Sequence, residues 1–404
     1  MTSSKARTIR LTLFGSVYFV EGAVLTYFSA FNVLYLRSFD LSYTLIGIIG
    51  GITLIPFVLK IFIGLLSDKV NLFGLGYRKP YIVTGLVFQS TAFLLLPLIN
   101  PGSSFALYTV CMIAAALGMS TYDTTTDGLS IDSTPPKDRG LVQGLMVGGR
   151  ALGSVLTATI MGFLSSSGLW FGIFVMIGAL GLLTLIPALL AEDLRGRSEP
   201  QPIPENARGG FRNLSFYFFL FLGILYPLAL YSSQGMIGAF LKEGMGVSLS
   251  SVGLYTSVFG IGTIAGGLAG GPLLRKAGER TGLFLAVAGT SLVTFALAIA
   301  PSAGLLWAVV FLFGLAFGYY ETVYFALGME YSDPRIAAFM FAFIMAVGNI
   351  GIGLGQPLAG ILVDRIGFRP MFGVFGALHL IALPLIFLIF VLRKAANKES
   401  RDAD

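Results

Sequence analysis

Long uninterrupted apolar runs recur along the whole chain and constrain its fold more than any other feature. Of the 404 residues, 55% are apolar and only 11% are charged, against roughly 25% charged residues in a soluble domain. A water-exposed surface must carry charge, so this composition excludes a soluble globular protein, and it also excludes a disordered one. The net charge of +6 comes without a basic run interleaved with aromatic residues, which disfavours nucleic-acid binding.

The apolar runs are long enough to cross a lipid bilayer as helices. A spanning helix needs about 20 mostly apolar residues, whereas a membrane barrel would show short alternating segments. Twelve such helices are predicted, at residues 11–36, 42–66, 81–99, 105–130, 140–166, 169–190, 213–240, 249–274, 282–300, 304–330, 336–362 and 370–392. The sequence therefore predicts an all-α integral membrane protein with twelve transmembrane helices.

A polar segment divides these helices into two sets of six. Residues 191–212 are rich in proline, glycine and arginine, a composition typical of a linker. We therefore expect an N-terminal six-helix bundle over residues 1–190, a cytoplasmic linker over 191–212, and a C-terminal six-helix bundle with a short cytoplasmic tail over 213–404.

Basic residues are distributed unevenly between the two sides of the predicted membrane protein. Four lie in loops on one side and two lie within helices: Arg37, Lys242, Arg365 and Arg369, and Lys60 and Arg150. The other 20 of the 26 lie on the side that holds both termini. Because lysine and arginine are enriched on the cytoplasmic side, both termini are expected in the cytoplasm. The expected membrane is the inner (plasma) membrane of a bacterium or an archaeon.

Short stretches of the two halves are alike. Tyr-Asp-Thr at residues 122–124 recurs as Tyr-Glu-Thr at 320–322, and Gly-Gly-Arg at 148–150 is matched by Gly-Asn at 348–349. Glycines recur on the helices that carry this second pair, which predicts close helix packing there. A parallel repeat of six-helix halves predicts two pseudo-symmetric bundles, with the substrate site between them near the middle of the membrane.

Six charged residues lie deep inside the predicted helices, where a charge is costly and often marks a transport pathway. They are Glu21, Lys60, Asp123, Asp127, Arg150 and Glu321. Asp123 and Asp127 share one helix face, where two like charges disfavour simultaneous ionisation, as suits a group that takes up and releases a proton. Arg150 offers a planar fork to a carboxylate or phosphate. We predict that the six bind substrate or couple its movement to protons.

A structural ion pair is the alternative for Glu21, Asp123, Asp127 and Arg150, in the last case with an acid of the first or fourth helix. Lys60 could instead extend its side chain to the cytoplasmic surface. Further polar and aromatic residues are candidates for lining a substrate cavity: Tyr27, Asn32, Gln89, Tyr122, Gln234, Tyr320, Tyr324, Asn349 and Gln356. Hydrogen bonding between helices is the alternative for each of these.

Signals for metal, cofactor or enzyme chemistry are missing from the sequence. The single cysteine, Cys111, and the single histidine, His379, exclude a Cys-based or multi-histidine metal site, and no cofactor is expected. No lysine is followed by serine or threonine, so the chain lacks a Walker A loop for ATP, and no Gly-x-Ser-x-Gly elbow occurs. We therefore do not expect an enzyme.

The turn after the second predicted helix resembles the signature loop of the major facilitator superfamily. It contains a glycine, an acid and two basic residues: Gly64, Asp68, Arg78 and Lys79. The resemblance implies that Asp68 and the basic residues form a charge latch that steadies one transport conformation. The corresponding loop of the second half has Arg275 where the acid would stand, so the resemblance does not extend to a second latch.

Four further segments resemble the AmpG-like branch of this superfamily, which includes muropeptide permeases and acetyl-CoA transporters. They are Ser-Tyr-Thr-Leu-Ile-Gly at 42–47, Pro-Phe-Val-Leu-Lys at 56–60, Asp-Thr-Thr-Thr-Asp at 123–127 and Gly-Arg-Ala-Leu-Gly at 149–153. The resemblance implies a bulky anionic cargo, such as a muropeptide, an acyl-CoA or a siderophore, and a monomeric protein.

Together these features predict a secondary active transporter that moves a small-to-medium organic anion by alternating access, as a proton-coupled symporter. Its expected partners are the solute, protons and the lipid bilayer, with no nucleic acid. The alternative is a membrane protein of the same fold that does not transport, such as a lipid- or pigment-handling assembly factor.

Overall fold

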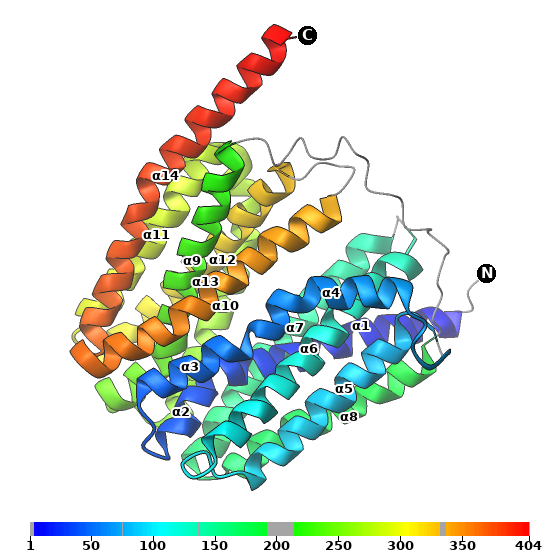
Figure 1. Ribbon diagram of the computed structural model, residues 1–404. Coiled ribbons are helices and arrows are strands. Elements are labelled where there is room, and N and C mark those ends of the chain that lie inside the picture. Colours follow the sequence, from blue (N-terminus) through cyan, green and yellow to red (C-terminus); the bar gives the residue numbers. More distant parts are fainter. Residues whose placement is uncertain (1–3, 75, 136–137, 192–213, 332–336, 404) are drawn as a thin grey trace. The chain divides into compact units, whose positions relative to one another are not determined.

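The protein is described here by a computed structural model that covers residues 4–74, 76–135, 138–191, 214–331 and 337–403. Within these ranges the chain forms helices joined by turns, with no strand (Figure 1). Twelve helical spans are long and apolar enough to cross a membrane. The predicted all-α fold with twelve transmembrane helices is therefore confirmed. The predicted linker at 191–212 lies outside the described residues, apart from its first residue.

Fourteen α-helices build the twelve spans in the described part of the chain. The first eight are α1 (Ser4–Thr26), α2 (Asn32–Arg37), α3 (Tyr43–Thr53), α4 (Ile55–Lys69), α5 (Lys79–Leu95), α6 (Phe105–Ser133), α7 (Arg139–Ser166) and α8 (Trp170–Leu190). The other six are α9 (Leu214–Ala239), α10 (Leu249–Ala277), α11 (Glu279–Ile299), α12 (Ala303–Tyr331), α13 (Ala337–Ile366) and α14 (Phe368–Ala403).

Two of the spans are interrupted helices rather than the single helices that were predicted. A π-helical turn at Tyr27–Phe31 joins α1 to α2. Leu54 separates α3 from α4, and Pro56 stands in the first turn of α4, where its missing N–H breaks no bond. Helix ends also extend beyond the apolar runs, to Ser4 in α1 and Ala403 in α14, because charged terminal turns carry no hydropathy signal.

The chain divides into two compact units. The first comprises Met1–Ser42, Ile52–Pro200 and Gly246–Ser257, and the second comprises Tyr43–Gly51, Gln201–Met245 and Val258–Asp404. In the first unit α1 packs on α7, and α5 packs on α6 and α8; in the second α9 packs on α13, and α11 packs on α12 and α14. When the spans of each set of six are numbered in chain order, the first packs on the fifth, and the third packs on the fourth and the sixth, in both units. The internal repeat predicts this agreement.

Each unit includes a short segment from the other half of the sequence. In the second unit, Asp364 of α13 caps the start of α3, because its carboxylate accepts bonds from the backbone N–H groups of Tyr43 (3.1 Å) and Thr44 (2.7 Å). In the first unit, Ser257 of α10 donates a hydrogen bond to the carbonyl of Val155 on α7 (2.8 Å). The predicted division into bundles at residues 190 and 213 does not include this exchange of two short segments. It stays a prediction.

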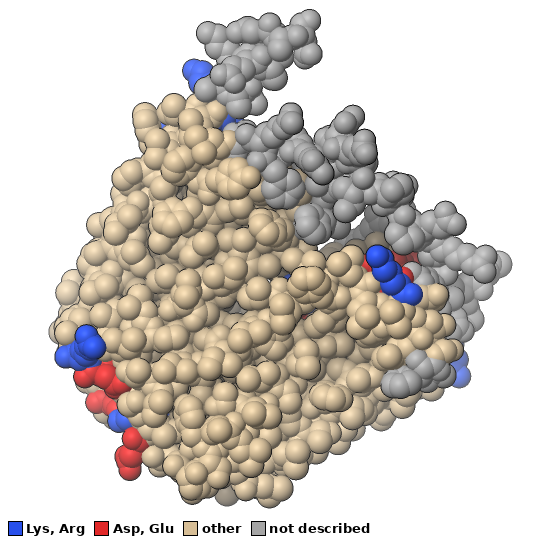
Figure 2. All heavy atoms as spheres, in the orientation of Figure 1, with Lys and Arg blue, Asp and Glu red and all other residues tan. Residues whose placement is uncertain are grey.

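Large apolar side chains are exposed on many of the helices. Phe62, Leu268 and Ile299 are exposed over 66%, 75% and 77% of their surface. Most of the face shown in Figure 2 is uncharged, and its charged side chains gather in a few places near the margins. An exposed apolar surface of this extent is unstable in water and suits contact with lipid tails.

Glycines allow the backbones of paired helices to touch. A Cβ atom added to Gly153 of α7 would collide with the carbonyl of Phe19 on α1, and one added to Gly22 would collide with the carbonyl of Arg150. In the second unit, Gly351 of α13 lies equally close to the carbonyl of Ile224 on α9. Small residues let membrane helices approach closely, so the predicted packing role is confirmed for Gly153 and Gly351, whereas Gly144 and Gly148 of α7 have open space around them.

We expect Gly153→Ala to lower the stability of the purified protein, because the added methyl group meets a backbone carbonyl that cannot move aside. Overpacking of this kind costs about 1–3 kcal/mol. Gly144 is the matched control on the same helix, since it has open space around it, and Gly144→Ala should unfold at the wild-type temperature or above. Thermal unfolding in detergent measures both, and equal midpoints for the two variants would contradict the proposed crossing.

Candidate functional site

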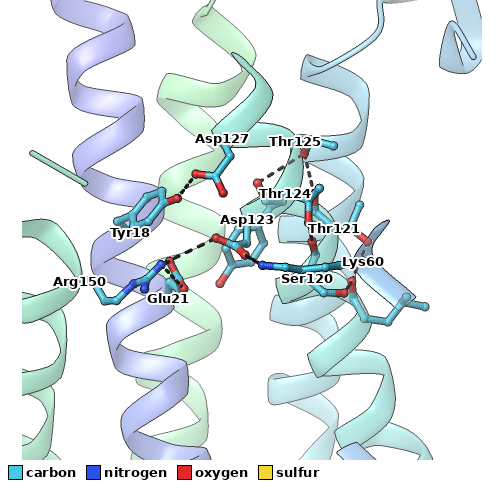
Figure 3. A network of polar contacts seen from close by, with 12 residues as sticks. Tyr18, Glu21, Lys60, Ser120, Thr121, Asp123, Thr124, Thr125, Asp127 and Arg150 are labelled. Carbon is cyan, nitrogen blue, oxygen red and sulfur yellow. Dashed lines mark hydrogen bonds and ion pairs between the residues drawn. The ribbon is translucent and has the colours of Figure 1, made fainter. Parts of the chain in front are cut away.

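Five of the six charged residues predicted for the site come together inside the first unit (Figure 3). Their helices are far apart in the sequence: α1 carries Glu21, α4 carries Lys60, α6 carries Asp123 and Asp127, and α7 carries Arg150. We call these five residues the charge cluster. The spacing of residues along one helix does not show which helices lie side by side, so the sequence could not predict that these four converge. The high cost of an isolated charge in the membrane did predict that the charged residues would pair with one another.

Arg150 and Glu21 form the closest ion pair of the cluster. Nη2 of Arg150 lies 2.7 Å from one carboxylate oxygen of Glu21 and donates a hydrogen bond to the other at 2.9 Å. Glu21 is buried, with 3% of its surface exposed, whereas the Arg150 side chain keeps 44% of its surface accessible. The sequence left open whether Arg150 pairs with an acid of the first or of the fourth helix, and the structure shows the pair with Glu21 of the first helix.

Asp123 lies between the two cations of the cluster. One of its carboxylate oxygens lies 3.6 Å from Nζ of Lys60, and the other lies 3.9 Å from Nη2 of Arg150. All carboxylate contacts of Arg150 thus use the same nitrogen, Nη2. An arginine fork has further N–H donors besides those of Nη2, and through them it can bind a second carboxylate or phosphate.

Asp127 has a different environment from the other two acids. Its carboxylate accepts a hydrogen bond from the hydroxyl of Tyr18 on α1, and it forms no ion pair with a described cation. The guanidinium of Arg150 lies over the Tyr18 ring, 4.9 Å from its centroid. Tyr18 therefore connects Asp127 to the Arg150–Glu21 pair.

Sequence reasoning missed Tyr18, although one signal pointed to it. Tyr18 precedes Glu21 by three residues and so lies on the same face of α1.

On α6, the hydroxyls of Thr124 and Thr125 donate to backbone carbonyls one turn earlier, at 2.8 Å and 2.7 Å. These threonines are therefore satisfied by their own helix and leave the two aspartates to the other partners (Figure 3).

Glu321, the sixth predicted residue, belongs to the second unit. Its carboxylate accepts a hydrogen bond from the hydroxyl of Tyr226 on α9 at 2.9 Å. The Tyr226 ring stacks on Tyr320 and packs against Tyr324, with ring centroids 4.6 Å apart in both pairs. Glu321 thus repeats Asp123 in its position on the helix, and one of its partners is the aromatic hydroxyl of Tyr226.

The nine predicted cavity-lining residues divide by burial. Six are buried between helices: Tyr27, Asn32, Gln89, Tyr122, Tyr320 and Tyr324. Three are partly accessible: Gln234, Asn349 and Gln356. Tyr27 bonds the hydroxyl of Tyr108 on α6 (2.7 Å), which donates to Asn32 (2.9 Å), so Tyr27 and Asn32 contribute hydrogen bonds between helices. A cavity role for the nine stays a prediction.

Two residues of the signature loop, Asp68 at the end of α4 and Arg78 just before α5, are in contact with each other. Arg78 pairs with Asp68 (2.5 Å) and with Asp132 of α6 (3.0 Å), and it donates to the hydroxyl of Ser67 (2.8 Å). A Cβ on Gly128 would collide with the Arg78 guanidinium, so that glycine lets the side chain cross α6. Asp132, Ser67 and Gly128 were not predicted as members of this group.

The other two predicted latch residues lie beside this contact. Lys79 donates a hydrogen bond to the carbonyl of Leu189 on α8 (2.5 Å), and Gly64 faces a methyl group of Thr124 on α6. The second unit has a related arrangement from other residues, because Arg393 of α14 pairs with Glu279 (2.5 Å) and Glu330 (2.8 Å). Among the described residues, each unit thus has an arginine that joins two carboxylates at its helix ends.

A sequence profile and curated relatives match this chain. The profile of the Major Facilitator Superfamily matches residues 14–355 and 219–404. The anhydromuropeptide permease of Escherichia coli K12 is 24% identical over 360 residues, which are 84% of this chain and 70% of the permease. The gallate transporter of Pseudomonas putida is 28% identical over 181 residues, which are 44% of this chain and 40% of that protein. The resemblance to AmpG-like permeases is thereby confirmed.

Solved structures match the fold over nearly the whole chain. A bacterial homolog of the human lysosomal transporter Spinster covers 96% of this chain and 98% of its own, with a TM-score of 0.76 at 20% identity. A D-xylose-proton symporter covers 94% and 96%, with a TM-score of 0.73 at 14% identity. With this fold and the matched profile, the chain belongs to the Major Facilitator Superfamily as a multi-pass integral membrane protein.

Proposed function

We propose that this protein is a secondary active transporter that moves an organic anion by alternating access, with the anion coupled to protons. The observation that carries the proposal is the charge cluster, in which Arg150 is anchored by Glu21 through a single nitrogen and remains 44% accessible. An anchored guanidinium with a free edge is a suitable receptor for an anionic group. The membrane and orientation we propose are those predicted above, with both termini in the cytoplasm of a prokaryotic cell, and the protein acts as a monomer.

A carboxylate is the chemical group we propose for recognition. The relatives are named for anhydromuropeptide, gallate and 4-hydroxybenzoate transport, and all three solutes carry a carboxylate. Arginine binds carboxylates through two parallel hydrogen bonds. A bulky cargo such as a muropeptide, an acyl-CoA or a siderophore satisfies the same requirement, and the cluster recognises the anionic group rather than the rest of the cargo.

The charge balance of the cluster supports proton coupling. Three carboxylates face two cations, so one formal negative charge is left among Glu21, Asp123, Asp127, Lys60 and Arg150. An additional carboxylate would raise that excess in a low-dielectric site, at a large electrostatic cost. If one proton enters with each singly charged anion, the total charge of the cluster is unchanged. Anion binding is therefore favoured when a proton is taken up at the same time.

Asp127 is the proton carrier we propose. Glu21 and Asp123 are held by cations, so a proton on either of them would weaken an ion pair. The hydrogen bond from Tyr18 to Asp127 involves a neutral group, and Asp127 can therefore gain a proton without losing an ion pair. Through the Tyr18 ring, which lies under Arg150, the protonation of Asp127 is sensed at the anion site.

Removal of Arg150 alone should damage folding as well as binding. Arg150→Met leaves the buried Glu21 carboxylate uncompensated, at a cost of about 3–5 kcal/mol, so a fall in expression is expected. Arg150→Met combined with Glu21→Gln removes both charges, and we expect this double variant to be folded but unable to bind carboxylates. Glu21→Gln alone should still bind them, because Arg150 remains.

Thermal shift of the purified protein with gallate, 4-hydroxybenzoate, folate and an anhydromuropeptide measures this binding. Arg275→Met is the matched control, since Arg275 is exposed outside the cluster. A ligand that stabilises the double variant as much as the wild type would show that Arg150 is not the anion receptor.

Asp127→Asn should uncouple transport from protons while leaving the solute pathway intact. In proteoliposomes we expect this variant to exchange solute across the membrane at a rate near that of the wild type. Accumulation of solute driven by a pH gradient should fall to the level without a gradient, because the proton-carrying group is gone. Glu321→Gln is the comparison in the second unit, and it should keep pH-driven accumulation. Loss of coupling in Glu321→Gln with normal coupling in Asp127→Asn would transfer the proton site to Glu321.

The charge latch should stabilise the ends of α4, α5 and α6 against local opening. Arg78→Gln leaves Asp68 and Asp132 without their cation, and we expect backbone hydrogen exchange of these helix ends to accelerate by about tenfold or more, which is the effect of losing about 1.4 kcal/mol. Lys79→Gln removes a neighbouring positive charge whose ammonium donates a hydrogen bond to the backbone carbonyl of Leu189, and it should have a smaller effect. Equal exchange rates in the two variants would refute a latch centred on Arg78.

A further inference from the structure

A small cavity lies at the end of the first unit where three helices meet. It has a volume of about 50 Å³ and is lined by residues from the start of α1, the end of α6 and the start of α7, including Arg7, Arg10, Ser133, Thr134 and Asp138. A single water needs about 10–15 Å³ measured in the same way. The cavity therefore has room for a small group with several oxygen atoms, and it is separate from the charge cluster.

Arg10 is an unusual residue for this position because it is buried. Only 6% of its surface is exposed, and its Nη1 atom lies buried without a hydrogen-bond partner in the part of the chain that the structure describes. A buried guanidinium nitrogen without a partner carries the full cost of its desolvation. This cost is recovered if an acceptor from outside the chain occupies the cavity.

The charges that line the cavity favour an anion. Among the described residues of its lining Asp138 is the only acid, and its carboxylate pairs with Arg7 at 3.3 Å. The Arg7 side chain remains 52% exposed. Two guanidinium groups against one carboxylate leave one positive charge, and this charge belongs to the buried Arg10.

The helix that begins at the cavity adds to the same preference. Asp138 occupies the N-cap position of α7, yet its side chain makes no capping hydrogen bond. The first N–H groups of this 28-residue helix are therefore not used by the cap, and the positive end of the helix dipole favours an anion.

The depth of the cavity suggests which anion. The candidate spans that border it begin at Lys5 and Leu141 and end at Ser133, so the cavity lies at one end of these spans, the end at which a spanning helix meets the polar headgroups of a bilayer. Phosphate is the anion concentrated at that level. A tetrahedral phosphate group also presents several acceptor oxygens, which suits donors that come from three helices.

We propose that this cavity is a phosphate-binding site centred on Arg10. The phosphate is supplied either by a phospholipid headgroup or by a soluble phosphate compound, and in both cases the Arg10 guanidinium, Arg7 and the start of α7 bind its oxygens. The site does not depend on the proposed transport of carboxylates, because it shares no residue with the charge cluster.

Two measurements on the full-length purified protein distinguish the sources. Inorganic phosphate added to delipidated protein in detergent, at constant ionic strength against chloride, tests the soluble source through the unfolding temperature. Native mass spectrometry after incubation with phosphatidylglycerol tests the lipid source through the number of lipids retained. The variant is Arg10→Gln, and the control is Arg275→Gln, which removes an exposed arginine elsewhere.

We expect the wild type and the control either to be stabilised by phosphate or to retain one phosphatidylglycerol. In Arg10→Gln the affinity for that phosphate or lipid should be at least about tenfold weaker. A phosphate response identifies a soluble ligand, and lipid retention alone identifies a headgroup. Equal responses of the wild type and Arg10→Gln in both measurements would overturn the proposal. If Arg10→Gln does not fold, Arg10→Lys keeps the charge but loses the planar fork and should show the same loss of binding; wild-type protein that responds to neither probe overturns the site without any variant.

Discussion

The ion pair between Glu21 and Arg150 is the interaction on which the rest of the charge cluster depends. An unpaired charge at this depth of a membrane helix is strongly unfavourable, so each partner is tolerated because the other lies within 2.7 Å. The pair exists because Gly22 and Gly153 let the backbones of α1 and α7 touch. The same helix crossing therefore packs the unit and fixes the guanidinium, and Asp123, Lys60 and Tyr18 take their positions around it.

The two units share a helix arrangement but differ in the chemistry they carry. Glycine contacts join α1 to α7 in one unit and α9 to α13 in the other. The first unit places five charged residues in its interior, whereas the second surrounds Glu321 with tyrosines. At the helix ends Arg78 joins two carboxylates in the first unit and Arg393 does so in the second. The two units are thus more alike in helix packing than in the polar side chains that they enclose.

Hydropathy predicted the twelve spans because the bilayer imposes length and apolarity on every helix. It could not predict the break at Leu54 or the capping of α3 by Asp364, which depend on one proline and on a residue more than 300 positions away. The rarity of charge inside the helices pointed to all five members of the charge cluster, because an isolated charge in a membrane helix is costly. Tyr18 and Asp132 escaped notice because a tyrosine in a helix and an acid at a helix end are common, and only tertiary contacts distinguish them.

Proton movement that accompanies solute movement tests the central claim most directly. Wild-type protein is reconstituted in liposomes that contain a pH-sensitive dye, and a gradient of a carboxylate solute is applied without any pH gradient. Anion–proton symport through the charge cluster predicts acidification of the lumen as solute enters, in proportion to the solute transported. Solute entry with no change in internal pH would contradict the coupling, and no entry of any carboxylate would contradict the transport of organic anions itself.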